Sequence, residues 1–133
     1  MNKAVNIVNI SLIIVQNIKK EVLLLHRPEN VHCPSCWSYP GGKVKNKESF
    51  QQAAQRELYE ETNIITAQWH NMARFQHDYP EGSFYFHLFH TMMSPTQTIL
   101  SSEKHLWFSI DQLHTLNMPK ANKQFLDKIY QLK

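Results

Sequence analysis

Three glutamates near the middle of the chain have the spacing to bind one metal ion together. Glu57, Glu60 and Glu61 stand at positions i, i+3 and i+4 of "SFQQAAQRELYEET", residues 49–62. On a helix with about 100° per residue, this spacing projects all three onto one patch. Clustered carboxylates repel one another and stay ionised together only beside strong positive charge. A hard divalent cation such as Mg²⁺ supplies that charge and prefers carboxylates together with the phosphate oxygens of a substrate.

These acids share the helix side that carries its apolar stripe. Phe50, Ala54 and Leu58 project close together, Glu61 falls between Phe50 and Ala54, and Glu57 lies beside Phe50. The ordinary alternative is an acidic helix end that faces solvent. That alternative does not explain why acids occupy the apolar side next to a double-glycine segment. We therefore prefer the metal site.

The helix that must position the acids has a defined start and end. Ser49 and Gln52 make an S-x-x-Q capping box, which predicts the N-terminus. Asn63 follows the last turn, where a left-handed residue is needed and asparagine is the best substitute for glycine. On the other side, Gly41 and Gly42 permit a backbone turn that most residues resist.

The remaining elements follow from β-branched and aromatic runs bounded by turn residues. The first two strands are expected to pair as a hairpin, and the final helix to be amphipathic. We expect strands near residues 4–16, 21–27, 37–40, 66–78, 84–92 and 105–110, a helical turn from 109 or 111 to 116, and a helix over 120–132.

Length and composition indicate one domain that spans residues 1–133. The chain is 42% hydrophobic and carries a formal net charge of +3, which excludes a highly basic nucleic-acid coat and an acidic tail. The apolar run "SLIIV" is far short of the ~20 residues that span a bilayer, and no cleavage site follows it. We expect a cytoplasmic protein, a monomer or homodimer, with no membrane partner.

The spacing resembles the Nudix box, G-x5-E-x7-R-E-U-x-E-E-x-G-U, where U is apolar. Asn63 replaces the second glycine of that pattern. The resemblance implies an α+β fold in which a mixed β-sheet lies between helices, an α/β/α sandwich. It also implies hydrolysis of a nucleoside diphosphate linked to another group. The matching residues are Gly42, Glu48, Arg56, Glu57, Leu58, Glu60, Glu61 and Ile64.

The same resemblance implies a role for each acid of the box. The residue matching Glu57 orients or deprotonates the attacking water, and Glu48 forms an ion pair with Arg56 that aims Glu57. The implied ion is Mg²⁺, for which Mn²⁺ can substitute, and a metal ion offsets developing charge and acidifies bound water. The implied ligands are Glu57, Glu60, Glu61 and the carbonyl of Gly41.

Outside the box, the chain is similar to the MutT branch of the family, which hydrolyses oxidised dGTP to the monophosphate and pyrophosphate. This implies 8-oxo-dGTP or another purine dNTP as the small-molecule substrate, with no nucleic-acid polymer as partner. Glu103 is the candidate for a further metal-side acid or base. The position of an arginine in that branch is Gly82 here, which bears on base selectivity. The implied substrate residues are Arg27, His32, Tyr39, Tyr79 and Asn122, and Lys43 is added beside the glycines.

Several alternatives stay open. The substrate could instead be a pyrimidine dNTP, a nucleotide sugar, a dinucleoside polyphosphate or capped RNA, or the chain could be a non-catalytic nucleotide-binding module. Asn122 could cap the last helix, and Lys43 could be a solvated loop charge. Cys33 and Cys36 form one CxxC, which with nearby histidines could bind zinc or act as a redox pair. We favour two reduced thiols in a substrate-side loop.

Overall fold

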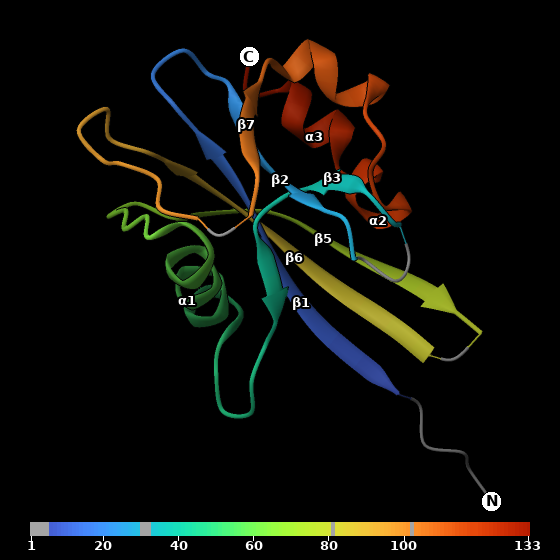
Figure 1. Cartoon of the computed structure of the whole chain (residues 1–133). Helices are drawn as coiled ribbons and strands as arrows, with labels where there is room; N and C mark the ends of the chain where they lie inside the picture. Colours follow the sequence, from blue (N-terminus) through green and yellow to red (C-terminus); the bar gives the residue numbers. More distant parts are fainter. Residues whose placement is uncertain (1–5, 30–32, 81, 102) are drawn as a thin grey trace, which may run out of the picture.

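The computed structural model describes residues 6–29, 33–80, 82–101 and 103–133 (Figure 1). Over these residues a seven-stranded mixed sheet carries helices on its faces. The strands are β1 (Ile7–Gln16), β2 (Val22–Arg27), β3 (Cys36–Ser38), β4 (Gly41–Lys43), β5 (His70–Tyr79), β6 (Gly82–Met92) and β7 (His105–Phe108). The helices are α1 (Phe50–Thr62), the 3₁₀ helix η1 (Ile110–Thr115), α2 (Lys120–Lys123) and α3 (Leu126–Tyr130).

Strand β1 is the centre of the sheet. It pairs in parallel with β6 along its whole length, from Ile7↔Ser83 to Gln16↔Met92, and β5 continues the sheet antiparallel to β6. On its other side, β1 pairs antiparallel with β4 and, near its end, with β2. Strands β3 and β7 both pair with β2. The expected hairpin of β1 and β2 and the expected mixed sheet are thus confirmed.

Alternate residues of β1 build two cores. Ile13 and Val15 face α1 and pack in one cluster with Leu58. Leu12 and Ile14 belong to the other cluster, with residues of η1, α2 and α3. Side chains alternate between the faces of a strand, so one apolar run serves both layers. The expected α+β sandwich is confirmed.

Both predicted caps of α1 are present. The Ser49 hydroxyl accepts from the Gln52 amide and the Gln52 side chain accepts from the Ser49 amide, which completes the capping box. Asn63 is left-handed at φ 62°, and its N–H donates to the carbonyl of Tyr59. Local sequence therefore sets both ends of the helix that carries the acids.

Three expectations need correction. Residues 120–132 form two short helices because the bonds from Gln124 and Phe125 go to carbonyls three residues back, which tightens the backbone between them. Gly41 and Gly42 form strand β4 against β1 rather than a turn. Strand β5 begins at His70, not residue 66.

Residues 4 and 5 of the first expected strand lie outside the described residues. In the described part of the chain, no helix has the length and apolar character needed to cross a bilayer. Among these helices α1 is the longest, at 13 residues.

Candidate functional site

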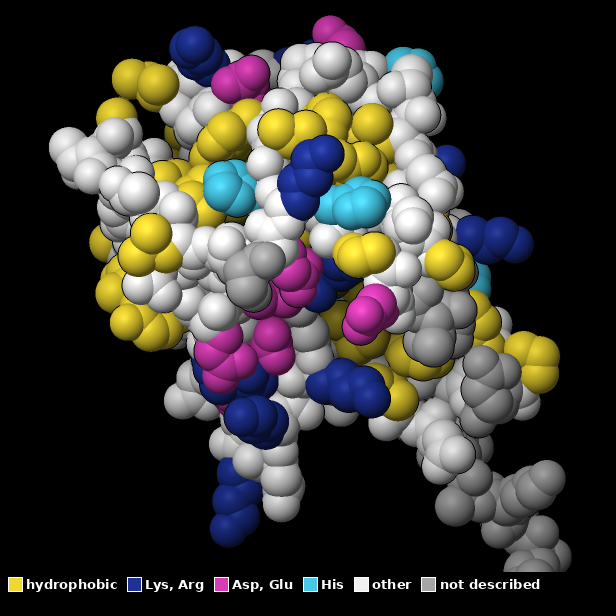
Figure 2. All heavy atoms as spheres, viewed as in Figure 1, with side chains coloured by type: hydrophobic (Ala, Val, Ile, Leu, Met, Phe, Trp, Pro, Cys, Tyr) yellow, Lys and Arg dark blue, Asp and Glu magenta, His cyan; other side chains and the backbone are white. Residues whose placement is uncertain are grey.

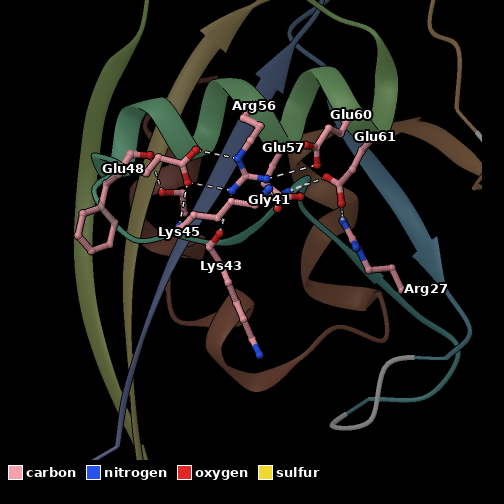
Figure 3. Close-up of polar contacts among 11 residues, drawn as sticks. Arg27, Gly41, Lys43, Lys45, Glu48, Arg56, Glu57, Glu60 and Glu61 are labelled. Atoms are coloured by element: carbon pink, nitrogen blue, oxygen red, sulfur yellow. Dashed lines mark hydrogen bonds and ion pairs between the residues drawn. The ribbon is translucent and has the colours of Figure 1, made fainter.

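The acidic helix α1 lies against the two glycines of β4. A Cβ on Gly42 would lie 2.6 Å from the Glu57 carboxylate carbon, so glycine leaves room for that carboxylate. The Gly41 N–H donates to Glu61 Oε1 at 2.9 Å (Figure 3). Gly41 has φ +146°, and a Cβ there would lie 2.1 Å from the Ser11 carbonyl oxygen. The two glycines thus let β4 lie close to the backbone of β1 and to the carboxylates of Glu57 and Glu61.

Arg56 holds three of the acids. Its guanidinium donates two hydrogen bonds to Glu48, from Nε to Oε2 at 2.7 Å and from Nη2 to Oε1 at 2.9 Å. Nη1 reaches Glu57 at 2.9 Å and Glu60 at 3.3 Å, while Nη2 also donates to the Lys43 carbonyl at 3.0 Å. The bonds from Arg56 lower the pKa of Glu48 to about 2. This bidentate geometry fixes the loop before α1 and the direction of Glu57.

Arg27 contacts Glu61, the last of the acids on α1. Its Nη2 donates to Glu61 Oε2 at 2.6 Å, and its Nη1 lies 4.0 Å from Glu103 Oε1. Burial raises the pKa of Glu61 to about 7, although Arg27 and the Gly41 amide oppose the shift. Glu103 Oε2 and Arg27 Nε are buried with no hydrogen-bond partner among the described residues. Glu103 therefore belongs to the same polar cluster as Glu61.

Two arginines supply positive charge to the acids. The Glu48–Arg56 ion pair is present as expected, and Arg27 contacts Glu61 from the other side. Within the described ranges, no three Asp, Glu, His or Cys side chains are gathered around a single ion position. The donor chemistry nevertheless fits a hard divalent cation, since it consists of oxygens only. Burial raises the pKa of Glu61, and a bound cation would favour the ionised form of this carboxylate.

A pocket opens beside the acidic cluster. Figure 2 shows the acidic side chains gathered on one face of the molecule, with basic side chains next to them. Arg27, Gly41 and Gly42 line this pocket and also contact or adjoin the acids. The rest of the lining is mostly apolar: Ile10, Leu12, Ser38, Tyr39, Tyr79, Phe84, Phe86, Pro119, Ala121 and Asn122.

Asn122 is a buried polar residue in the lining of the pocket. Its side chain is buried, and its Nδ2 has no hydrogen-bond partner within the described part of the chain. The N-cap positions of α2 and of the last helix α3 are Pro119 and Phe125, so the capping alternative for Asn122 is wrong. Tyr39 is 1% exposed and donates its hydroxyl to the Asn122 carbonyl at 3.3 Å. Burial raises the pKa of Tyr39, which keeps this hydroxyl protonated.

The other predicted substrate residues take different places. Tyr79 is partly exposed at the pocket wall, with its ring 5.0 Å from that of Phe84. The Lys43 side chain is exposed, and its carbonyl rather than its amine is the group that contacts Arg56. His32 lies outside the described residues. No disulfide joins Cys33 and Cys36.

Sequence reasoning missed some residues of the site. Phe84 and Phe86 alternate along β6 and line the pocket, and the alternation in "FYF" is the signal that could have indicated them. Ser38, the last residue of β3, lines the pocket, and no pattern in the sequence indicated it. Ser11 donates its hydroxyl to the Phe50 carbonyl at 2.6 Å, which ties β1 to the start of α1. A buried serine in an apolar strand is the trace that could have indicated this bond.

The chain is similar in sequence and in structure to a family of known proteins. The NUDIX domain family profile matches residues 6–131. An 8-oxo-dGTP diphosphatase of Buchnera aphidicola is 32% identical over 95 residues, 70% of this chain and 76% of that protein. One of Haemophilus influenzae is 27% identical over 92% of this chain and 91% of its own. The crystal structure of a MutT protein from Methanosarcina mazei superposes with a TM-score of 0.76 at 24% identity, over 98% of this chain and 96% of the other.

Proposed function

Because the chain belongs to the NUDIX domain family and is a MutT-like hydrolase, we propose that it cleaves a purine nucleoside triphosphate to the monophosphate and pyrophosphate. The preferred substrate in this proposal is 8-oxo-dGTP, and the physiological role is to clear oxidised nucleotides from the pool. Support comes from relatives named 8-oxo-dGTP diphosphatase and from the pocket beside the acids.

One observation carries the proposal: the pocket and the acidic cluster share residues. Arg27 donates to Glu61 and lines the pocket, and Gly42 lines the pocket and adjoins Glu57. If the base of a nucleotide bound in the apolar pocket, the phosphates of that nucleotide would therefore lie at the carboxylates. Planar apolar rings with one polar contact are typical of small-molecule sites.

The acids would hold Mg²⁺, with Mn²⁺ as a substitute, through Glu57, Glu60, Glu61 and the Gly41 carbonyl. When bound, the ion would offset phosphate charge and make water more acidic. Arg56 positions Glu57 through its bond at 2.9 Å, and Glu57 accepts the proton of the attacking water. Glu103, held near Glu61 by Arg27, is the second candidate acid or base.

Selection of the base would depend on Asn122 and Tyr79 in the lining of the pocket. The free Nδ2 of Asn122 is a buried donor that gains most from a carbonyl acceptor on a base. Tyr79 at the wall offers a ring for stacking. An oxidised guanine carries such carbonyl groups and adenine carries none, which supports an oxidised guanine over adenine.

A substrate panel with Mg²⁺ tests this proposal. The panel holds 8-oxo-dGTP, dGTP, the pyrimidine dNTPs, a nucleotide sugar, a dinucleoside polyphosphate and capped RNA, and monophosphate and pyrophosphate are quantified. We expect the highest kcat/KM for 8-oxo-dGTP and no turnover with a chelator present.

The result can contradict the proposal at two levels. A preference for a pyrimidine or for a compound that is not a triphosphate would move the chain to another Nudix specificity. Nucleotide binding with no hydrolysis of any compound would make it a binding module. Asn122→Ala should lower the preference for 8-oxo-dGTP over dATP, while Asn71→Ala, an exposed position on β5 outside the pocket lining, should keep that preference.

A further inference from the structure

The pair Cys33 and Cys36 lies next to the pocket, and the proposed hydrolysis does not use it. These are the only two cysteines of the chain, and no disulfide joins them. Cys36 is fully buried at the start of β3, while Cys33 in the preceding loop is partly exposed. In the described residues no third Asp, Glu, His or Cys joins them in a metal-binding group. The pair is therefore a dithiol with one accessible member.

The loop brings the two thiols together. Ser35 between them is left-handed at φ 57°, and its N–H donates to the Pro28 carbonyl at 3.3 Å, which closes the loop. Burial, and secondly the neighbouring Cys33 side chain, raise the pKa of Cys36 to about 12. Cys36 thus stays a protonated thiol next to Cys33, and reagents from solvent reach Cys33 first.

The dithiol contacts two sides of the pocket. Cys36 pairs with Arg27 across β3 and β2, and Arg27 lines the pocket and holds Glu61. Cys33 donates its S–H to Asn117 Oδ1 at 3.7 Å, and the Trp37 N–H donates to the Asn117 carbonyl at 2.8 Å. Asn117 leads directly into the pocket wall at residues 119–122. A change at the thiols would be transmitted to both walls.

We propose that Cys33 and Cys36 form a reversible disulfide with a hydroperoxide as oxidant, and that this disulfide weakens nucleotide binding in the pocket. The Cys33 thiolate attacks the peroxide oxygen, the O–O bond breaks, and a sulfenic acid forms as the alcohol or water leaves. Cys36 then gives up its proton as its sulfur attacks the Cys33 sulfur, the S–S bond forms, and the sulfenic hydroxyl leaves with that proton as water. Two thiols lose two electrons and the peroxide gains them. The bond removes the Cys33 S–H from Asn117 and constrains the strand beside Arg27.

Thiol counting and intact mass test the bond itself, with no dependence on hydrolysis. After hydrogen peroxide, we expect the chain to lose both thiols and two hydrogen atoms, to stay monomeric on a non-reducing gel, and to recover with dithiothreitol. Cys36→Ala should stop at a sulfenic acid that dimedone traps on Cys33. Cys33→Ser should leave Cys36 unmodified. Sulfinic acid in the wild type, a cross-linked dimer or two unreacted thiols would each overturn the proposal.

The coupling to the pocket rests on the proposed function and has its own measurements. Oxidation should raise KM for the best nucleotide by about 5-fold or more, the low end of coupling between sites, with no change in Cys33→Ser. Amide exchange at Trp37 and residues 117–122 should change in parallel, which does not require turnover. A disulfide that leaves KM and exchange unchanged would refute the coupling. Absence of hydrolysis in the reduced enzyme, with altered exchange, would refute only the proposed function.

Discussion

At the scale of single residues, the site consists of two arginines that form ion pairs with five carboxylates. Arg56 contacts Glu48, Glu57 and Glu60, whereas Arg27 contacts Glu61 and lies 4.0 Å from Glu103. Glycine at position 42 is required because a carboxylate occupies the space of a side chain. The arginines can keep the acids in place before substrate and metal arrive.

Gly42→Ala should separate catalysis from stability. The new Cβ would meet the Glu57 carboxylate at 2.6 Å and displace it, and a misplacement of about 1 Å can cost roughly 100-fold in rate. We expect kcat to fall on that scale while the melting temperature changes little. Gly41→Ala is the contrast, since it clashes with the Ser11 backbone at φ +146° and should destabilise the fold. A Gly42→Ala enzyme with normal kcat would show that Glu57 need not stay where it lies.

The charge of individual acids can be removed without a change of shape. Glu57→Gln and Glu61→Gln should each reduce turnover by about 100-fold or more, because one loses a proton acceptor and both lose a candidate metal ligand. Circular dichroism should show an intact fold. Glu21→Gln, in the β1–β2 turn where Glu21 pairs with Asn17, is the control and should keep its rate. Near-normal rates in both site variants, measured by pyrophosphate release, would mean that the site is misassigned.

At the scale of elements, helix α1 is the best-defined unit. Its N-cap and C-cap bonds are all local, and Ala53, Ala54 and Leu58 bury its inner face. The C-terminal segment is different, because its two short helices are set by how Phe125 and Ile129 fill the core under the sheet. Elements with strong caps need less tertiary support.

The capping box gives a stability prediction for α1. Ser49→Ala removes the acceptor for the Gln52 amide, and loss of such a cap costs about 1 kcal/mol. Urea unfolding should show this decrease in the free energy of unfolding. Asn63→Gly at the other end should be neutral or stabilising, because glycine suits φ 62° at least as well. A Ser49→Ala protein as stable as wild type would argue that tertiary packing alone holds the helix start.

At the scale of the molecule, the site lies where the two layers meet the sheet. Strand β4 pairs with β1 and supplies Gly41 and Gly42, helix α1 brings the acids from one face, and residues 119–122 form the pocket wall from the other. Global unfolding therefore disperses the site completely, and charges within it contribute to the stability of the whole chain.

The buried Glu61 predicts a pH dependence of unfolding in the metal-free protein. Its pKa in the folded state is about 7, above the ordinary 4.5, so the folded chain binds more protons between these values. Stability contributed by this group is fully present below pH 4.5 and is lost as the pH rises through 7. Chemical denaturation of wild type and Glu61→Gln at pH 5 and 8 should show a smaller decline in the variant. Parallel curves would contradict the assignment.

The sequence by itself determined the helix of residues 50–62, both of its caps, the β-branched strands and the acids that mark the family. These features depend on neighbours within one or two turns, so spacing alone expresses them. Only the tertiary structure decided that Gly41 and Gly42 form a strand, that residues 120–132 break into two helices and that Arg27 holds Glu61. Each of these outcomes depends on groups far apart in the chain, such as Arg27 with Glu61 or Gly41 with Ser11. The pocket has the same origin, since its walls come from β1, β4, β6 and residues 119–122, and only packing brings them together.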